Sequence, residues 1–268
     1  MANTKKLPVF EKLVPADFVQ YVADELKTTI EQIDKRYNWP TLKGLQKAVE
    51  AFNDKGRKDH KKYSELPEAF INGISQCLES QSDAAATLAM REAFSEAWHS
   101  ASETKEREAL IRFVANTWGG MGLGKETVRE LAEQYAKEPG KLKGGKARIP
   151  SRSKILASID PEERFIYDSR VSKALYSFWS IREKKVSGYP VTPFPKLRGR
   201  GDPADADAIA YKKPFRYEEV YCRFIKEVGD ALARCDSFKN AKPRELRQKV
   251  EMALFILSDK AGKEVRHE

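Results

Sequence analysis

Two side chains in the segment RIPSRSKILASIDPEERFIYDSRVSKAL (148–175) could act together in covalent chemistry. Lys154 offers an amine that can serve as a nucleophile, and Asp168 offers a carboxylate as its partner. The dipole at a helix start disfavours a cation, and apolar burial acts in the same direction, so both favour the free amine. Each residue also has an ordinary interpretation. Lys154 would be a surface residue in a first helical turn, and Asp168 would be the N-cap of a helix over 169–179.

A glycine-rich segment offers a second kind of chemistry. GGMGLGKE (119–126) matches the phosphate-binding loop G-x-x-x-x-G-K-[ST] except at its last position, where Glu126 replaces the magnesium-binding hydroxyl. Such a loop should follow a buried strand, whereas the preceding IRFVANTW continues a helical pattern. The glycines therefore predict a helix stop and a close-packed turn, and a P-loop-like nucleotide enzyme is kept as a remote alternative.

The metal-binding residue types do not form a site in the sequence. The cysteines and histidines are Cys77, Cys222, Cys235, His60, His99 and His267. No pair has the spacing of zinc ligands or of a redox motif, and nothing suggests a disulfide framework. We expect no metal and no cofactor.

The charge balance favours a polyanionic partner. The chain carries 49 basic and 40 acidic side chains, a formal net charge of +9 and a pI of about 9.3, which attracts polyanions without specificity. No apolar run approaches the roughly 20 residues of a membrane span, and the N-terminal MANTKKLPVFEKL lacks the apolar core of a signal peptide. These features predict a soluble, cytoplasmic protein.

The elements that must position Lys154 and Asp168 are predicted to be helices. Apolar residues recur at helical spacing along most of the chain and period-2 alternation is scarce, so the fold class is all-α. We expect one unit over 1–268. Its tentative parts are a helical lobe over 15–137, a hairpin and catalytic segment over 138–180, a long Pro/Gly-rich loop over 181–214 and C-terminal helices over 215–260.

The order of features around Lys154 resembles that of the helix–hairpin–helix DNA glycosylases. The chain runs from a turn rich in basic residues to a lysine at a helix start. An apolar stretch then leads to an aspartate at the next helix start. SKIL, FIYDSRVSKAL and the closing VEMALFIL look like small prokaryotic proteins with the 8-oxoguanine-glycosylase fold. The resemblance implies two helical lobes with a cleft between them and a hairpin that grips DNA phosphate. It also implies that Lys154 attacks the sugar C1′ and that Asp168 assists.

The hairpin sequence departs from the family pattern. The usual turn is of the Leu-Pro-Gly-Val-Gly type, but here Pro150-Ser151-Arg152-Ser153 replaces the glycines that let a backbone approach phosphate. We therefore expect side chains to replace some of the backbone contacts, with basic residues supplying most of the affinity. The residues expected to bind DNA are Lys146, Arg148, Arg152, Ser153 and Arg170.

A glycosylase also needs an aromatic side chain to stack the extruded base. Trp118 is the candidate for this base pocket, with a buried core tryptophan as the ordinary alternative. Together these expectations describe a DNA glycosylase with lyase activity that acts on double-stranded DNA containing a damaged or modified base. Oxidised guanine in base-excision repair and a hypermodified phage base in anti-phage defence both remain open. A non-catalytic DNA-binding protein on the same scaffold is the alternative, and we expect no membrane and no obligate protein partner.

Overall fold

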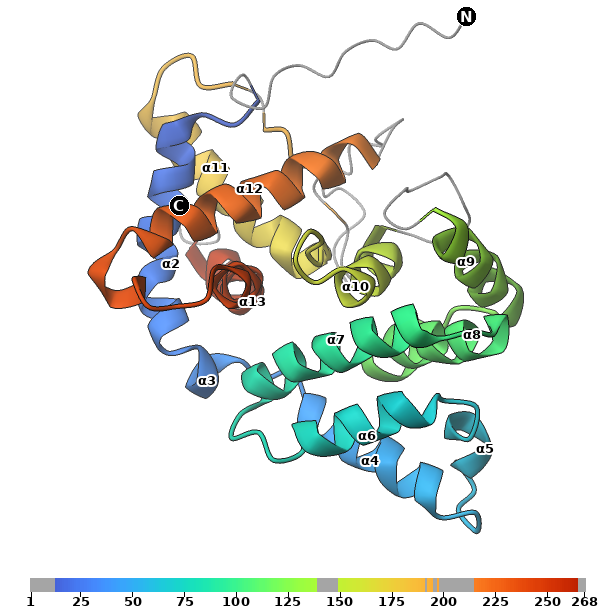
Figure 1. The fold of residues 1–268 in the computed structure, drawn as a ribbon. Coiled ribbons are helices and arrows are strands. Elements are labelled where there is room, and N and C mark those ends of the chain that lie inside the picture. The colour runs from blue at the N-terminus through green and yellow to red at the C-terminus, as the bar shows by residue number, and fades with distance from the viewer. Residues whose placement is uncertain (1–12, 139–148, 191, 195–196, 198–214, 265–268) are drawn as a thin grey trace, which may run out of the picture. The chain divides into compact units, whose positions relative to one another are not determined.

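The computed structural model describes residues 13–138, 149–190, 192–194, 197 and 215–264 (Figure 1). Every element of regular structure in these residues is a helix, which confirms the all-α prediction. No helix in the described ranges is long and apolar enough to cross a membrane. The chain divides into two compact units. Unit 1 comprises Met1–Glu31 and Asp168–Glu268, and unit 2 comprises Gln32–Tyr167.

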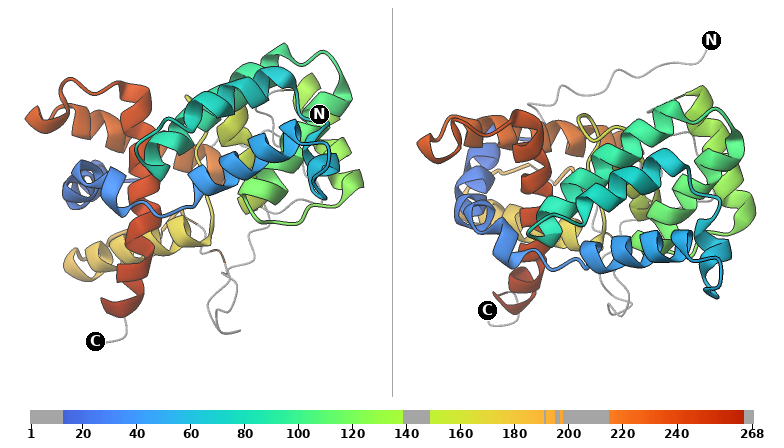
Figure 2. Two further views of the ribbon diagram at one scale, coloured as in Figure 1. Left: turned by 90° about the horizontal axis from the view of Figure 1, so that it is seen from below. Right: turned by 60° about the horizontal axis from the view of Figure 1, so that its bottom comes forward.

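Unit 2 contains the helices that position Lys154. They are α3 (Ile33–Arg36), α4 (Thr41–Asn53), α5 (His60–Tyr63), α6 (Glu68–Cys77), α7 (Asp83–Ser100), α8 (Thr104–Arg112), the π-helix η1 (Phe113–Trp118), α9 (Lys125–Lys137) and α10 (Ile149–Ile159). Helices α4, α6 and α7 pack against one another (Figure 2), and α10 packs on α7 and η1. Gly73 allows the close approach of α6 and α7, since a Cβ there would lie 2.7 Å from the Cβ of Ala93.

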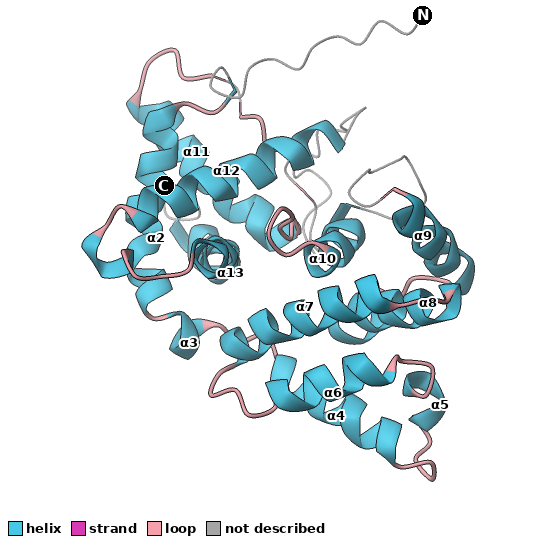
Figure 3. Ribbon diagram, in the orientation of Figure 1, coloured by secondary structure: helices cyan, strands magenta, loops and turns pink. Residues whose placement is uncertain are grey.

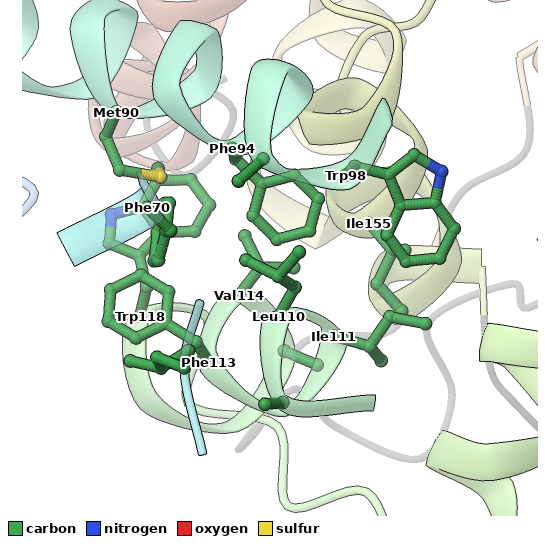
Figure 4. Close-up of a cluster of buried hydrophobic side chains, with 14 of the residues drawn as sticks. Phe70, Met90, Phe94, Trp98, Leu110, Ile111, Phe113, Val114, Trp118 and Ile155 are labelled. Atoms are coloured by element: carbon green, nitrogen blue, oxygen red, sulfur yellow. The ribbon is translucent and has the colours of Figure 1, made fainter. Parts of the chain in front are cut away.

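The core of unit 2 is apolar and rich in aromatic rings (Figure 4). The ring of Phe70 meets those of Phe94 and Phe113 edge-on, with centroids 5.9 and 5.1 Å apart. Ile155 of α10 belongs to the same cluster, one residue after Lys154. Burial of this apolar face therefore fixes α10 against η1, and with it the direction in which Lys154 leaves the helix.

Unit 1 consists of α2 (Ala16–Glu31), α11 (Ser169–Lys185), α12 (Phe215–Ala233), the 3₁₀ turn η2 (Asp236–Phe238) and α13 (Pro243–Glu264), with loops in between (Figure 3). Phe18, Trp179, Phe194 and Phe224 form its aromatic cluster. Phe194 comes from the predicted loop over 181–214. Its burial shows that this part of the loop is anchored in the core.

The boundaries differ from the prediction in two places. The expected lobe over 15–137 is divided, because α2 packs with α12 and α13 in unit 1 while the helices from α3 onward belong to unit 2. The expected loop begins later than 181, because α11 continues to Lys185. Beyond Trp179, Arg182 of α11 binds Asp17 of α2 by a hydrogen-bonded ion pair.

Candidate functional site

The segment predicted to form a hairpin is helical. α10 begins at Ile149, so Pro150–Ser153 lie in its first turn and Lys154 lies one turn further in. The prediction of a turn over 150–153 was therefore wrong. Proline fits the first turn of a helix because its φ is already helical and its missing N–H is not needed there.

The Lys154 side chain is buried, with only 6% of its surface exposed. Its Nζ donates a hydrogen bond to the carbonyl oxygen of Gly119 at 3.4 Å and lies 4.8 Å from the centroid of the Trp39 ring. A Cβ on Gly119 would come within 3.3 Å of Lys154 Cδ. The lysine stem thus runs across a position that only glycine leaves open, and the amine ends between a carbonyl and an aromatic face.

Gly119 ends the π-helix η1 and starts a tightly braced turn. Its N–H donates to the Val114 carbonyl at 2.9 Å, and Gly120 and Gly122 have φ values of +67° and +61°, which glycine adopts without strain. Asn116 closes the turn, because its Oδ1 accepts from Leu123 N at 2.6 Å and its Nδ2 donates to Leu123 O at 2.9 Å. The predicted helix stop is confirmed. The element before the glycines is a helix, whereas a phosphate-binding loop requires a strand there.

Trp118 is a core residue, as its ordinary interpretation expected. It is buried, and the guanidinium of Arg91 lies 6.0 Å from its ring centroid (Figure 4 shows Trp118 in the core). The Trp118 Nε1 donates to Thr41 Oγ1 at 3.1 Å. A ring enclosed in this way is not available to stack an extruded base, so its assignment to a base pocket is corrected.

Trp39 is the aromatic residue that sequence reading missed. It is partly exposed, its ring centroid lies 5.9 Å from that of Trp118, and its face meets the Lys154 amine. Nothing local pairs Trp39 with Lys154 in the sequence. The one available signal was a large aromatic side chain directly before Pro40, where a helical pattern breaks.

A chain of hydroxyl groups holds the start of α4, and therefore Trp39, against α7. Thr87 Oγ1 donates to the Asp83 carbonyl at 2.8 Å, which leaves Thr41 Oγ1 to donate to Thr87 Oγ1 at 2.7 Å. The side chain of Asp83 accepts from Leu42 N at 2.8 Å. The N-cap of α7 is Ser82, whose hydroxyl accepts from Ala85 N, and not the adjacent Asp83. The Asp83 carboxylate instead fixes the first turn of α4.

Asp168 is the N-cap of α11, which confirms its ordinary interpretation. Its Oδ1 accepts from Arg170 N at 3.0 Å and from Val171 N at 3.1 Å. Asp168 is buried, and it is the residue at which the chain returns to unit 1. Lys154 belongs to unit 2. Asp168 therefore has a structural role, whatever chemistry it also performs.

The residues immediately before Lys154 and Asp168 are bonded to each other within unit 2. The hydroxyl of Ser153 accepts from Tyr167 N at 3.0 Å and donates toward Tyr167 O at 3.3 Å and Pro150 O at 3.2 Å. Ser153 is fully buried, so its predicted contact with DNA phosphate is corrected. Its hydroxyl joins the two ends of the 153–167 segment instead.

The other predicted DNA contacts have different outcomes. Arg152 is fully buried, and its Nε donates to Tyr135 Oη at 3.4 Å, so it stabilises the interior of unit 2 and does not reach phosphate. Arg170 is exposed, and its guanidinium lies 4.4 Å from the Phe255 ring centroid in unit 1. Lys146 and Arg148 lie outside the described residues.

Comparison of the chain with protein-family models, with curated proteins and with solved structures gave no match.

Proposed function

We propose that the chain is a DNA glycosylase with lyase activity, in which Lys154 is the nucleophile and Asp168 the assisting carboxylate. The observation that carries the proposal is the position of the Lys154 amine, which is buried and directed by the Gly119 carbonyl and the Trp39 ring. This supports the proposal because a nucleophile that is already fixed lowers the entropic cost of attack. The order of Lys154 and Asp168 along the chain gives the same assignment by resemblance.

The proposed reaction uses no metal and no nucleotide. Lys154, after losing its proton, attacks C1′ of the extruded nucleotide. The glycosidic bond breaks, its electron pair leaves with the base, and the base takes up a proton. Asp168 stabilises the positive charge that develops on the sugar, as carboxylates do for other glycosidic bonds. Opening of the sugar ring gives a Schiff base between Lys154 and C1′, which permits elimination of the 3′ phosphate before water releases the lysine.

Borohydride trapping tests this proposal. Duplexes that contain assorted modified bases or an abasic site are incubated with the protein and reduced, so that a Schiff base becomes a stable adduct. We expect an adduct that disappears in Lys154→Gln and in Lys154→Met, which keeps the unbranched stem. Lys125→Gln is the matched control, because Lys125 is an exposed lysine of the same unit and its loss changes the net charge equally.

A non-catalytic DNA-binding protein is the second candidate. It is favoured by the helical first turn of α10, where Arg152 and Ser153 make interior contacts and Pro150–Ser153 form no hairpin. If no substrate gives an adduct or releases a base while salt-sensitive DNA binding persists, this second function is the correct one. Nucleotide hydrolysis that Lys125→Ala abolishes would contradict both.

A further inference from the structure

Unit 2 carries a compact basic surface far along the chain from Lys154. The segment KGRKDHKK (55–62), here called the basic turn, links α4 to α5 and includes the start of α5. Its four lysines are all exposed, whereas Arg57 and His60 are partly buried. The four exposed residues are Lys55, Lys58, Lys61 and Lys62.

The basic turn is anchored to α4 by its own polar residues. Arg57 Nη1 donates to Glu50 Oε2 at 2.7 Å and its Nε donates to Asp59 Oδ1 at 3.1 Å. The hydrogen bond to Asp59, and after it the one to Glu50, raises the pKa of Arg57. The same hydrogen bond from Arg57 lowers the pKa of Asp59. His60 Nδ1 donates to the Ala51 carbonyl at 2.8 Å. The lysines therefore project from an ordered support.

The acidic groups in the basic turn and directly before it make internal contacts. Asp54 Oδ1 accepts from Gly56 N at 2.9 Å, and Asp59 binds Arg57 and Lys47. Lys55, Lys58 and Lys61 make no ion pair within the part of the chain that the structure describes. The basic turn is therefore positively charged, because five basic side chains outnumber its single acidic one, Asp59.

We propose that the basic turn binds the sugar–phosphate backbone of double-stranded DNA. Ammonium groups on flexible stems attract phosphates without reading sequence. An anionic membrane would require an apolar anchor beside the lysines, yet Tyr63 is buried and the one exposed large apolar residue in the described ranges is Val186. A protein partner favours aromatic and arginine anchors, and the arginine here is committed to Glu50 and Asp59.

This inference rests on the proposed function only for the identity of the polyanion, and it does not depend on Lys154. The test replaces Lys55, Lys58, Lys61 and Lys62 with glutamine in the full chain. Binding to an undamaged 20-base-pair duplex is measured by fluorescence anisotropy from 50 to 200 mM salt. The control variant replaces four exposed lysines elsewhere, so that its net charge is identical. They are Lys35, Lys105, Lys239 and Lys242.

Each phosphate contact contributes about 0.9 to the slope of log affinity against log salt, so we expect the slope of the basic-turn variant to fall by about 2 to 4. We expect the control to lose less than about 1, and a set of Lys→Arg replacements in the turn to keep the wild-type slope. Circular dichroism confirms that each variant is folded.

Three results would overturn the proposal. They are an unchanged slope in the basic-turn variant, an equal fall in both variants, and preferential binding of the turn to RNA, acidic peptides or anionic vesicles. An absence of borohydride adducts together with turn-dependent DNA binding would contradict only the proposed catalysis. A wild-type protein without affinity for DNA would contradict both.

Discussion

Asp168 combines an observed structural role with a proposed chemical one, and substitution can separate them. One carboxylate oxygen accepts from the second and third backbone N–H groups of α11, at 3.0 and 3.1 Å. Asparagine and serine can cap a helix in the same way, but neither carries a negative charge. Alanine can do neither. Asp168→Asn and Asp168→Ser therefore remove the charge alone, whereas Asp168→Ala removes the charge and the cap together.

The two roles predict different magnitudes. Loss of an N-cap to alanine costs about 1 kcal/mol, with a range of roughly 0.5–2 kcal/mol, which corresponds to a fall in melting temperature of about 2–4 °C for a chain of this size class. Asp168→Asn and Asp168→Ser should stay close to the wild type in melting temperature. A carboxylate that takes part in the chemical step contributes roughly 100-fold or more to the rate, so all three variants should trap DNA at least about 100-fold more slowly.

The assay pairs thermal unfolding, followed by circular dichroism, with the single-turnover rate of borohydride trapping. Ser82→Ala is the matched control. It removes the N-cap of α7, where the hydroxyl accepts from Ala85 N at 3.1 Å, and should lower the melting temperature without changing the trapping rate of the folded protein. Trapping by Asp168→Asn at the wild-type rate would refute the catalytic role. Equal melting temperatures for Asp168→Ala and Asp168→Asn would refute the capping argument.

Two further predictions concern positions in unit 2. Gly119→Ala would place a Cβ 2.6 Å from the Val114 carbonyl and 3.3 Å from Lys154 Cδ, so urea unfolding should show a loss of about 1–3 kcal/mol and trapping should slow. Gly44→Ala, where a Cβ meets nothing within 4 Å, should not destabilise, and equal losses would contradict the packing argument. Burial raises the pKa of Cys77 to about 11 from 9.0, so stability should fall as pH rises from 9 through 11. In Cys77→Ala this fall should shrink, and an unchanged profile would exclude the thiol as its cause.

The helices were predictable because their apolar faces are periodic over many residues. The pattern Phe18, Val22, Leu26 and Ile30 marks α2, and all four are buried. The same pattern continues to Ile33, which is also buried, but a break at Gln32 divides α2 from α3 and unit 1 from unit 2. Periodicity records which residues are buried. It contains no information about the partner that buries them, so the division into units was missed.

The errors at Arg152 and Trp118 have a common physical origin. An arginine is almost never fully buried unless it is paired, so a basic residue beside Lys154 was assigned to DNA. Its partner, Tyr135 on α9, is identified only by the tertiary structure. Trp118 was judged by its place in a glycine-rich turn, whereas its environment is set by Thr41, distant in sequence. The contact of Lys154 with Trp39 also joins residues that are distant along the chain and has no local signature.

Ser153 is bonded to the other end of the segment that separates Lys154 from Asp168. Its hydroxyl meets both the N–H and the carbonyl of Tyr167, which closes a short stretch of chain at a small entropic cost. The residue that precedes Asp168 is thereby fixed to the residue that precedes Lys154, and this tie depends on no distant element. The hydroxyl that was predicted to contact DNA phosphate thus holds Ser153 to Tyr167, the residues that precede Lys154 and Asp168.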